Sequence, residues 1–135
     1  MLGLTFKPNT DDMRDAPAIA IVQALRDAGA TVRAYDPEGM AAAAPLLGEV
    51  AYTDSAYAVA EGASAIVIIT EWDAFRALDF ARLKAVMAMP VLVDLRNIYR
   101  ADDLAAAGFI YRSVGRPGDG EPVIHPETLK IPELQ

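Results

Sequence analysis

The sequence of 135 residues predicts an α/β fold, a three-layer sandwich in which helices cover both faces of a mainly parallel sheet. Six β-favouring runs alternate with helix-like stretches, and this alternation requires parallel strands joined by right-handed crossovers. Residues 65–70 form a continuous apolar run, which is typical of a strand buried on both faces of a parallel sheet. With 53% hydrophobic residues, the chain can form one domain with a core.

The chain opens on an expected strand, a polar loop and an amphipathic helix. Gly3-Leu4-Thr5-Phe6 is β-favouring, and residues 7–12 hold proline, asparagine and aspartates, which favour turns. Asp15 is expected to cap a helix whose apolar residues recur at spacings of three and four. Pro17 suits the first turn of this helix, and Gly29 suits its C-terminal end.

The remaining elements continue the alternation. Further strands are expected over residues 31–35, 50–52, 65–70, 91–95 and 109–114. Helices are expected over residues 39–47, 55–61, 80–87 (capped by Asp79) and 101–107, with a loop or helical turn at 71–75. The favoured strand order is 3-2-1-4-5-6, which makes the six-stranded sheet Rossmann-like.

The composition changes near the C-terminus. From Gly115 onward the chain holds four prolines, at positions 117, 122, 126 and 132, so little regular structure is expected there. We therefore divide the chain into a domain over residues 1–117 and a Pro-rich tail over residues 118–135.

Composition also excludes several function classes. The chain has no cysteine, so disulfides, thiolate metal sites and a cysteine nucleophile are excluded. Its single histidine, His125, lies in the tail, which argues against a histidine metal site or a catalytic triad. The net charge of −7 argues against nucleic-acid and anionic-membrane partners. No apolar run reaches the roughly 18 residues of a membrane span and no signal segment opens the chain, so a cytoplasmic protein is expected.

Polar residues follow several strands at the edge where such sheets bind ligands, beyond the carboxyl ends at the point where strand order reverses. Lys7 leaves the first strand, Thr70-Glu71-Trp72 leaves the fourth, and Arg96-Asn97 leaves the fifth. Arg14, just before the first helix, lies on the same side. Three cations on one edge of an acidic protein form the basic island that a diphosphate needs. The first loop lacks the G-x-G-x-x-G pattern, so long basic side chains would have to hold the anion.

Each of these residues also has a purely structural interpretation. Lys7 and Arg14 can be solvated charges that balance Asp11, Asp12 and Asp15. Arg96 can form a salt bridge with Asp94 or another nearby acid. Trp72 and Phe75 can be an apolar plug over the sheet edge, and Asp36-Pro37 is favoured as a turn rather than as a ribose-binding acid.

Several segments together resemble the C-terminal, UDP-binding domain of the UDP-glucose/GDP-mannose dehydrogenase family. They read GLTFKPNTDDMRDAPA, GATVRAYDP, TEWDAF, VDLRNIY and AGFIYRSVGRP, and the match covers residues 2–117 in order. FKPNTDD-x-R and DLRN are the most specific parts. TEW and DLRNIY resemble the members that act on UDP-glucose more than those that act on GDP-mannose.

The resemblance implies an NAD-dependent oxidation of UDP-glucose to UDP-glucuronate, which uses two NAD and serves polysaccharide biosynthesis. It implies an N-terminal Rossmann domain for NAD, a central helical dimerisation region, and this domain closing over the nucleotide sugar. By the same resemblance, Phe6 and Lys7 contact the nucleotide sugar, Arg96 pairs with it and Asn97 supports that loop. Arg14 approaches the NAD that the other domain holds, and the whole enzyme is expected to be a homo-oligomer.

The chain also departs from the family pattern. The family's catalytic cysteine and its glycine-rich loop are absent, and both belong to regions N-terminal to this domain. We therefore expect a fragment with a truncated first strand that is inactive alone. Three alternatives stay open: a stand-alone nucleotide-binding module, the same domain from another UDP- or GDP-sugar dehydrogenase, and an interaction domain whose cations are only surface charge.

Overall fold

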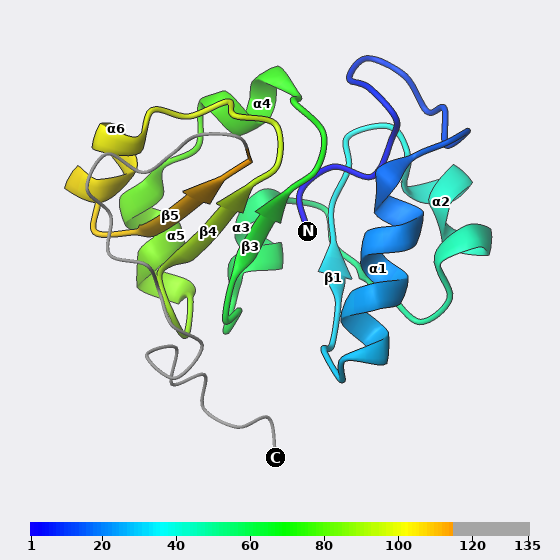
Figure 1. Ribbon diagram of the computed structural model, residues 1–135, viewed down its shortest axis with the longest axis horizontal. Coiled ribbons are helices and arrows are strands. Elements are labelled where there is room, and N and C mark those ends of the chain that lie inside the picture. The colour runs from blue at the N-terminus through cyan, green and yellow to red at the C-terminus, as the bar shows by residue number, and fades with distance from the viewer. Residues whose placement is uncertain (115–135) are drawn as a thin grey trace.

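The computed structural model describes residues 1–114, which alternate between helices and short parallel strands (Figure 1). The helices are α1 (Pro17–Asp27), α2 (Met40–Leu47), α3 (Ala56–Ala60), α4 (Asp73–Arg76), α5 (Phe80–Val86) and α6 (Ala101–Ala106). The strands are β1 (Arg33–Ala34), β2 (Ala51–Tyr52), β3 (Ile66–Ile68), β4 (Val91–Asp94) and β5 (Ile110–Ser113). The α/β class is confirmed. The Pro-rich tail predicted over residues 118–135 lies outside the described residues.

The strands pair in two separate parallel sheets. β1 pairs with β2, so that Arg33 lies opposite Ala51. The second sheet has the order β3-β4-β5, with Ile66 opposite Leu92 and Val91 opposite Ile110. In residues 1–114 the structure therefore holds five strands in two sheets, where the sequence predicted one continuous sheet of six.

The first residues of the chain lie between the two sheets (Figure 1). Leu2 forms isolated parallel bridges with Tyr35 on one side and with Ile68 on the other. The Leu2 N–H donates to Val67 O at 2.8 Å, and the Gly3 N–H donates to Tyr35 O at 2.9 Å. Leu2 thus occupies the position expected for the first strand, but with only one bridged residue.

The strand predicted over Gly3-Leu4-Thr5-Phe6 is wrong, because the backbone turns at Gly3 and the next N–H groups bond to a side chain distant in sequence. Gly3 has φ +90°, outside the β region, and a Cβ placed on it would lie 2.5 Å from the Cβ of Thr70. After this turn the N–H groups of Leu4 and Thr5 donate to the Asp36 carboxylate, at 2.7 and 3.1 Å, instead of to a neighbouring strand. The chain therefore leaves the sheet as soon as it has crossed it.

Helix caps were predicted with mixed success. The cap predicted at Asp79 is confirmed, because its side chain accepts from the Arg82 N–H; Ser55, for which no cap was predicted, caps α3 in the same way through the Ala58 N–H. The cap predicted at Asp15 is wrong: Asp15 has φ +53°, and Ala16 is the N-cap of α1 without a side-chain bond. Residues 71–75, predicted as a loop or helical turn, contain the start of α4.

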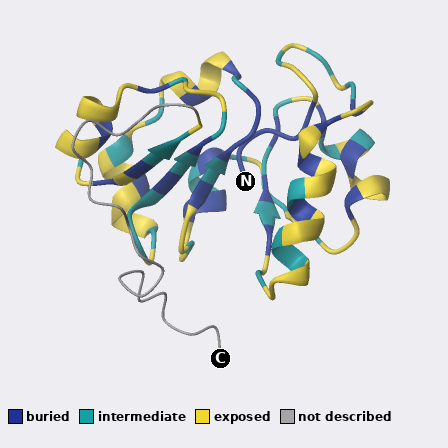
Figure 2. Cartoon of the chain, viewed as in Figure 1, coloured by how far each residue is buried: buried dark blue, intermediate teal, exposed yellow. Residues whose placement is uncertain are grey.

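Two apolar cores lie on opposite faces of β3. Ile66 and Ile68 belong to a core with side chains from α3, α5 and α6, whereas Val67 packs against a second core with side chains from α1 and α2. Because successive side chains of a strand point to opposite faces, helices cover both faces, as a three-layer arrangement requires. Figure 2 shows the buried residues along the strands and on the inner sides of the helices.

No helix within residues 1–114 is long and apolar enough to cross a membrane.

Candidate functional site

The loops that follow Gly3, β3 and β4 meet at one edge of the molecule. The Thr70 hydroxyl donates to Thr5 O at 2.8 Å, which joins the first two loops. Glu71 and Arg96 form an ion pair, which joins the second loop to the third. The predicted convergence of these loops at the carboxyl ends of the strands is therefore confirmed.

Asp36, directly after β1, organises the first of these loops. Its side chain is fully buried, and no cation lies within ion-pair distance of it in the described residues. Its two oxygens instead accept hydrogen bonds from the N–H groups of Leu4, Thr5, Glu38 and Gly39 and from Trp72 Nε1. Asp36 thus closes the turn that was favoured for it, and it also holds the segment that leads to Phe6 and Lys7.

Asp94, the last residue of β4, does the same for the loop that carries Arg96 and Asn97. It is fully buried, and its Oδ1 accepts from the Arg96 N–H at 3.0 Å. Its Oδ2 accepts from the N–H groups of Ile98 and Tyr99 and, at 2.7 Å, from the Tyr111 hydroxyl. A buried carboxylate is stable without a counter-ion when this many donors surround it.

Arg96 and Asn97 sit at the tip of the loop that Asp94 holds. Both are exposed, and Arg96 Nε donates to Glu71 Oε2. Arg96 therefore pairs with a nearby acid, although with Glu71 and not with Asp94. Asn97 adopts φ +55°, which asparagine tolerates better than most residues, and its Nδ2 donates to Val114 O at 2.8 Å. This bond ties the loop to the end of β5.

Arg14 is paired within its own loop. Its guanidinium donates to both carboxylate oxygens of Asp12, and the shortest of these bonds is 2.9 Å. The side-chain and backbone hydrogen bonds from Arg14 lower the pKa of Asp12 to about 2, and the pair raises the pKa of Arg14. The interpretation of Arg14 as a charge that balances a neighbouring acid is therefore confirmed in this state of the protein.

Phe6 and Lys7 project from the first loop. Phe6 is 51% exposed, which is high for a side chain of its size. Lys7 is exposed, and no carboxylate lies within 4.0 Å of its ammonium in residues 1–114. Lys7 is thus the cation of the predicted site that has no ion pair, whereas Arg14 and Arg96 each have one.

Trp72 and Phe75 are part of the core. Trp72 is 6% exposed and Phe75 is fully buried, so their interpretation as an apolar plug is confirmed. The Phe75 ring packs edge-on against Tyr35, and its carbonyl accepts from the Tyr99 hydroxyl. Burial, and secondarily the charge of Asp94, raises the pKa of Tyr99. This hydroxyl is therefore a structural donor rather than an acid.

Sequence reasoning missed the parts played by Glu71, Asp36 and Asp94. Glu71 was placed at the edge but was given no role, and Asp94 was considered only as a partner of the Arg96 side chain. A signal was present, because an acid at the end of a buried strand and just before a polar loop has few ways to be solvated except by the N–H groups of that loop. In the described residues no group of acids or histidines could hold a metal ion.

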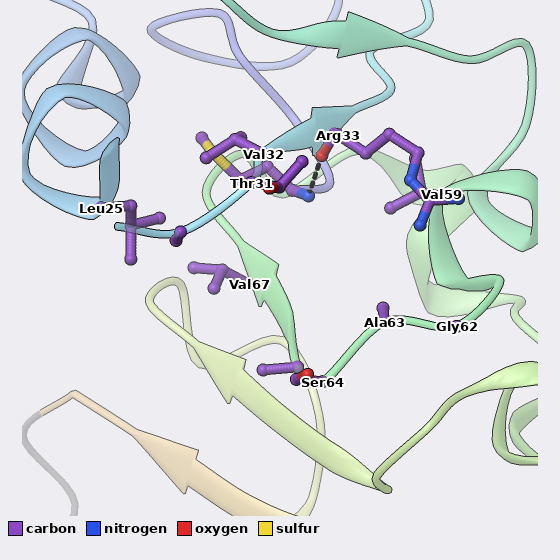
Figure 3. A pocket seen from close by; sticks show the side chains of 12 residues that line it. Leu25, Thr31, Val32, Arg33, Val59, Gly62, Ala63, Ser64 and Val67 are labelled. Carbon is purple, nitrogen blue, oxygen red and sulfur yellow. Dashed lines mark hydrogen bonds between the residues drawn. The ribbon is translucent and has the colours of Figure 1, made fainter. Parts of the chain in front are cut away.

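A cavity lies away from these loops. It has a volume of about 310 Å³ and is lined by residues that precede or begin β1 and β3, including Thr31, Val32, Ser64 and Ala65 (Figure 3). It therefore opens at the amino ends of the strands, where the two sheets are not joined. Arg33, in its lining, already donates to the carbonyls of Ala58 and Glu61 at the end of α3, so these guanidinium donors are occupied.

Comparisons by sequence and by structure both find nucleotide-sugar dehydrogenases as relatives of this chain. The model of the UDP-glucose/GDP-mannose dehydrogenase family, UDP binding domain, matches residues 1–101. The chain is 63% identical over 117 residues to a UDP-glucose 6-dehydrogenase of Rhizobium meliloti, which covers 87% of this chain and 27% of that protein. The chain thus spans about a quarter of the length of the curated relatives it matches.

Solved structures agree with the sequence relatives. An NDP-N-acetyl-D-galactosaminuronic acid dehydrogenase of Methanosarcina mazei Go1 superposes with a TM-score of 0.75 at 32% identity, over 87% of this chain and 24% of that one. A UDP-glucose dehydrogenase of Pyrobaculum islandicum superposes with a TM-score of 0.65 at 33% identity, over 76% of this chain and 22% of that one.

Proposed function

The chain belongs to the UDP-glucose/GDP-mannose dehydrogenase family as its UDP binding domain, and from this we propose that it serves a UDP-glucose 6-dehydrogenase. In the whole enzyme the reaction is the oxidation of UDP-glucose to UDP-glucuronate with two NAD. The high identity to a relative of that name supports the choice of UDP-glucose. Since the chain spans about a quarter of that relative, the other domains of the same enzyme supply the remaining machinery.

The nucleotide sugar binds at the edge where the three loops meet, with Lys7 and Arg96 facing its anionic groups. The observation that supports this assignment is that the loops bearing Lys7, Glu71 and Arg96 meet at one edge, where two buried carboxylates hold them in place. Phe6 supplies an exposed ring beside Lys7, and Asn97 keeps the Arg96 loop in its conformation. Cationic side chains replace the glycine-rich loop that other nucleotide sites use.

The other domains define the remaining partners. NAD is held mainly by an N-terminal domain, and Arg14 approaches it from this one after exchanging Asp12 for the cofactor. The working enzyme is a cytoplasmic homo-oligomer. Residues 1–117 form the domain, and its sheet in the whole enzyme has the six-stranded order 3-2-1-4-5-6.

Kinetics of the full-length enzyme that contains this domain test the proposal. We expect Lys7→Ala and Arg96→Ala each to raise the KM for UDP-glucose by roughly 10-fold to 100-fold, because hydrogen bonds to charged groups contribute about 1.5–3 kcal/mol. Lys84→Ala is the matched control, since Lys84 is an exposed lysine in the last turn of α5. An unchanged KM in both site variants would contradict the assignment.

One comparison favours a second candidate, a different sugar. The structural relative from Methanosarcina mazei is named for an N-acetylgalactosaminuronic acid product, and it superposes as well as the UDP-glucose enzyme does. A substrate panel on the full-length enzyme separates the two: we expect a higher kcat/KM for UDP-glucose than for UDP-N-acetylated sugars. The reverse preference would keep the domain assignment and change the substrate.

A further inference from the structure

We propose that Glu71 is a positioning residue for Arg96: it holds the guanidinium so that its two terminal nitrogens face the bound nucleotide. The inference rests on the proposed function, because it concerns the same edge of the molecule. It gives a role to an acid that would otherwise oppose the binding of an anion.

Glu71 stands on a rigid segment. Its neighbours Thr70 and Trp72 are buried, at 1% and 6% exposure. Thr70 is tied to the first loop through Thr5 O, and Trp72 is tied to Asp36 through its indole N–H. With both neighbours fixed, the backbone of Glu71 has little freedom, and its side chain reaches out from a defined point.

Arg96 is fixed at its backbone but not along its side chain. Its N–H donates to the buried Asp94, so the Cα position is set. The side chain beyond it is long and 44% exposed, and a free arginine side chain has considerable rotamer entropy. The bond from Arg96 Nε to Glu71 removes much of this freedom before any ligand arrives.

The role of Glu71 follows from which nitrogen of Arg96 it contacts. Glu71 accepts from Nε, at the side of the guanidinium, and no hydrogen bond or ion pair occupies Nη1 or Nη2 in the described residues. An arginine presents these two terminal nitrogens as a fork that matches two oxygens of one phosphate. Glu71 therefore leaves free the end of Arg96 that suits a diphosphate.

Stability does not account for the pair. Ion pairs between exposed groups contribute about 0–1 kcal/mol, and the side chains of Arg96 and Glu71 are 44% and 24% exposed. Glu71 could instead compete with the nucleotide for Arg96. In that case its replacement by alanine would tighten nucleotide binding, whereas the positioning role predicts weaker binding. The two roles can therefore be separated by experiment.

The test is an NMR titration of the 135-residue chain with UDP, followed at the Arg96 Nε–Hε signal. For the native chain, we expect UDP to leave this signal hydrogen-bonded while the Nη signals shift.

We expect Glu71→Ala to weaken UDP binding by about 10-fold, which corresponds to the restored freedom of one arginine. Glu71→Gln should recover most of the loss, because its carbonyl oxygen can still accept from Nε. The thermal midpoints of both variants should match that of the native chain.

Three other outcomes would contradict the positioning role of Glu71, the proposed function, or both. Equal or tighter binding by Glu71→Ala overturns the positioning role and favours competition. If Lys7→Ala weakens UDP binding but Arg96→Ala does not, the inference about Glu71 fails while the proposed function stands. If UDP shifts no signal of Lys7 or Arg96 in the native chain, the proposed function and the inference fail together.

Discussion

At the scale of single residues, two buried aspartates determine the geometry of the candidate site. Asp36 and Asp94 each end a parallel strand and accept several N–H groups from the loop that follows or faces them. Neither has a cationic partner in the described residues, so the backbone dipoles of the loops stabilise their charge. Within residues 1–114 this arrangement leaves the nearby cations available: Lys7 has no ion pair there, and no hydrogen bond or ion pair occupies the two terminal nitrogens of Arg96.

The pair between Asp12 and Arg14 makes a prediction about pH. Because hydrogen bonds from Arg14 lower the pKa of Asp12 from 3.8 to about 2 in the folded chain, this contribution to stability is present above pH 4 and is lost as the pH falls toward 2. We expect the Asp12 carboxyl carbon to titrate near pH 2 by NMR. Arg14→Ala should return its pKa toward 3.8, the ordinary value.

Arg100→Ala is the control for this titration, because Arg100 is exposed and lies before α6, in a different part of the chain. It should leave the Asp12 midpoint unchanged. An Asp12 midpoint near 4 in the native chain would mean that the pair does not persist in solution.

At the scale of elements, residues 1–3 join the two sheets, and Leu2 is the one among them that forms bridges on both sides. Leu2 bridges Tyr35 and Ile68, and its side chain is fully buried in the core that α3, α5 and α6 share. The pairing on either side is short, since β1 holds two residues and β3 holds three. The relative position of the two halves therefore depends strongly on the packing of this segment.

Leu2→Ala tests this dependence. We expect it to lower the free energy of unfolding by about 2–5 kcal/mol, as is usual when a fully buried leucine is truncated. Urea unfolding, followed by circular dichroism and by Trp72 fluorescence, measures the change. Trp72 belongs to the same core as Leu2, so both signals should report the loss.

Leu46→Ala is the matched control, because Leu46 is 52% exposed on α2. A surface change of this kind should alter the free energy of unfolding by less than about 0.5 kcal/mol. Equal effects of the two substitutions would show that Leu2 does not join the sheets in solution.

At the scale of the whole molecule, the proposed function assigns binding of the nucleotide sugar to this domain and oxidation to the rest of the enzyme. The chain has no cysteine, and its one histidine lies outside the described residues. The resemblance to the family assigns oxidation to a cysteine and to an NAD domain, and this chain spans 27% of its relative from Rhizobium meliloti. We therefore propose that binding and oxidation are divided between domains.

We therefore expect the purified chain to produce no NADH from NAD and UDP-glucose, measured by the near-ultraviolet absorbance of NADH. The full-length enzyme under the same conditions is the positive control. Detectable turnover by the chain alone would mean that its own residues carry the oxidation, and the division of roles proposed above would be wrong.

The sequence alone determined the fold class, the alternation of elements and the family. Alternation and the apolar runs at 65–70 and 91–95 are local patterns, and the helix cap at Asp79 needs only neighbouring residues. The motifs FKPNTDD-x-R and DLRN carried the family, which the match over residues 1–101 confirmed. The convergence of the three loops followed from topology, because parallel strands end at one edge.

Only the tertiary structure decided which groups pair. The strand predicted over residues 3–6 failed because Asp36 and Thr70, distant in sequence, offer the first loop better contacts than a neighbouring strand does. Glu71 rather than Asp94 pairs with the Arg96 side chain, because the N–H groups of its own loop surround Asp94. Propensity and spacing act over a few residues, whereas the partners of a charged group depend on which loops folding brings together.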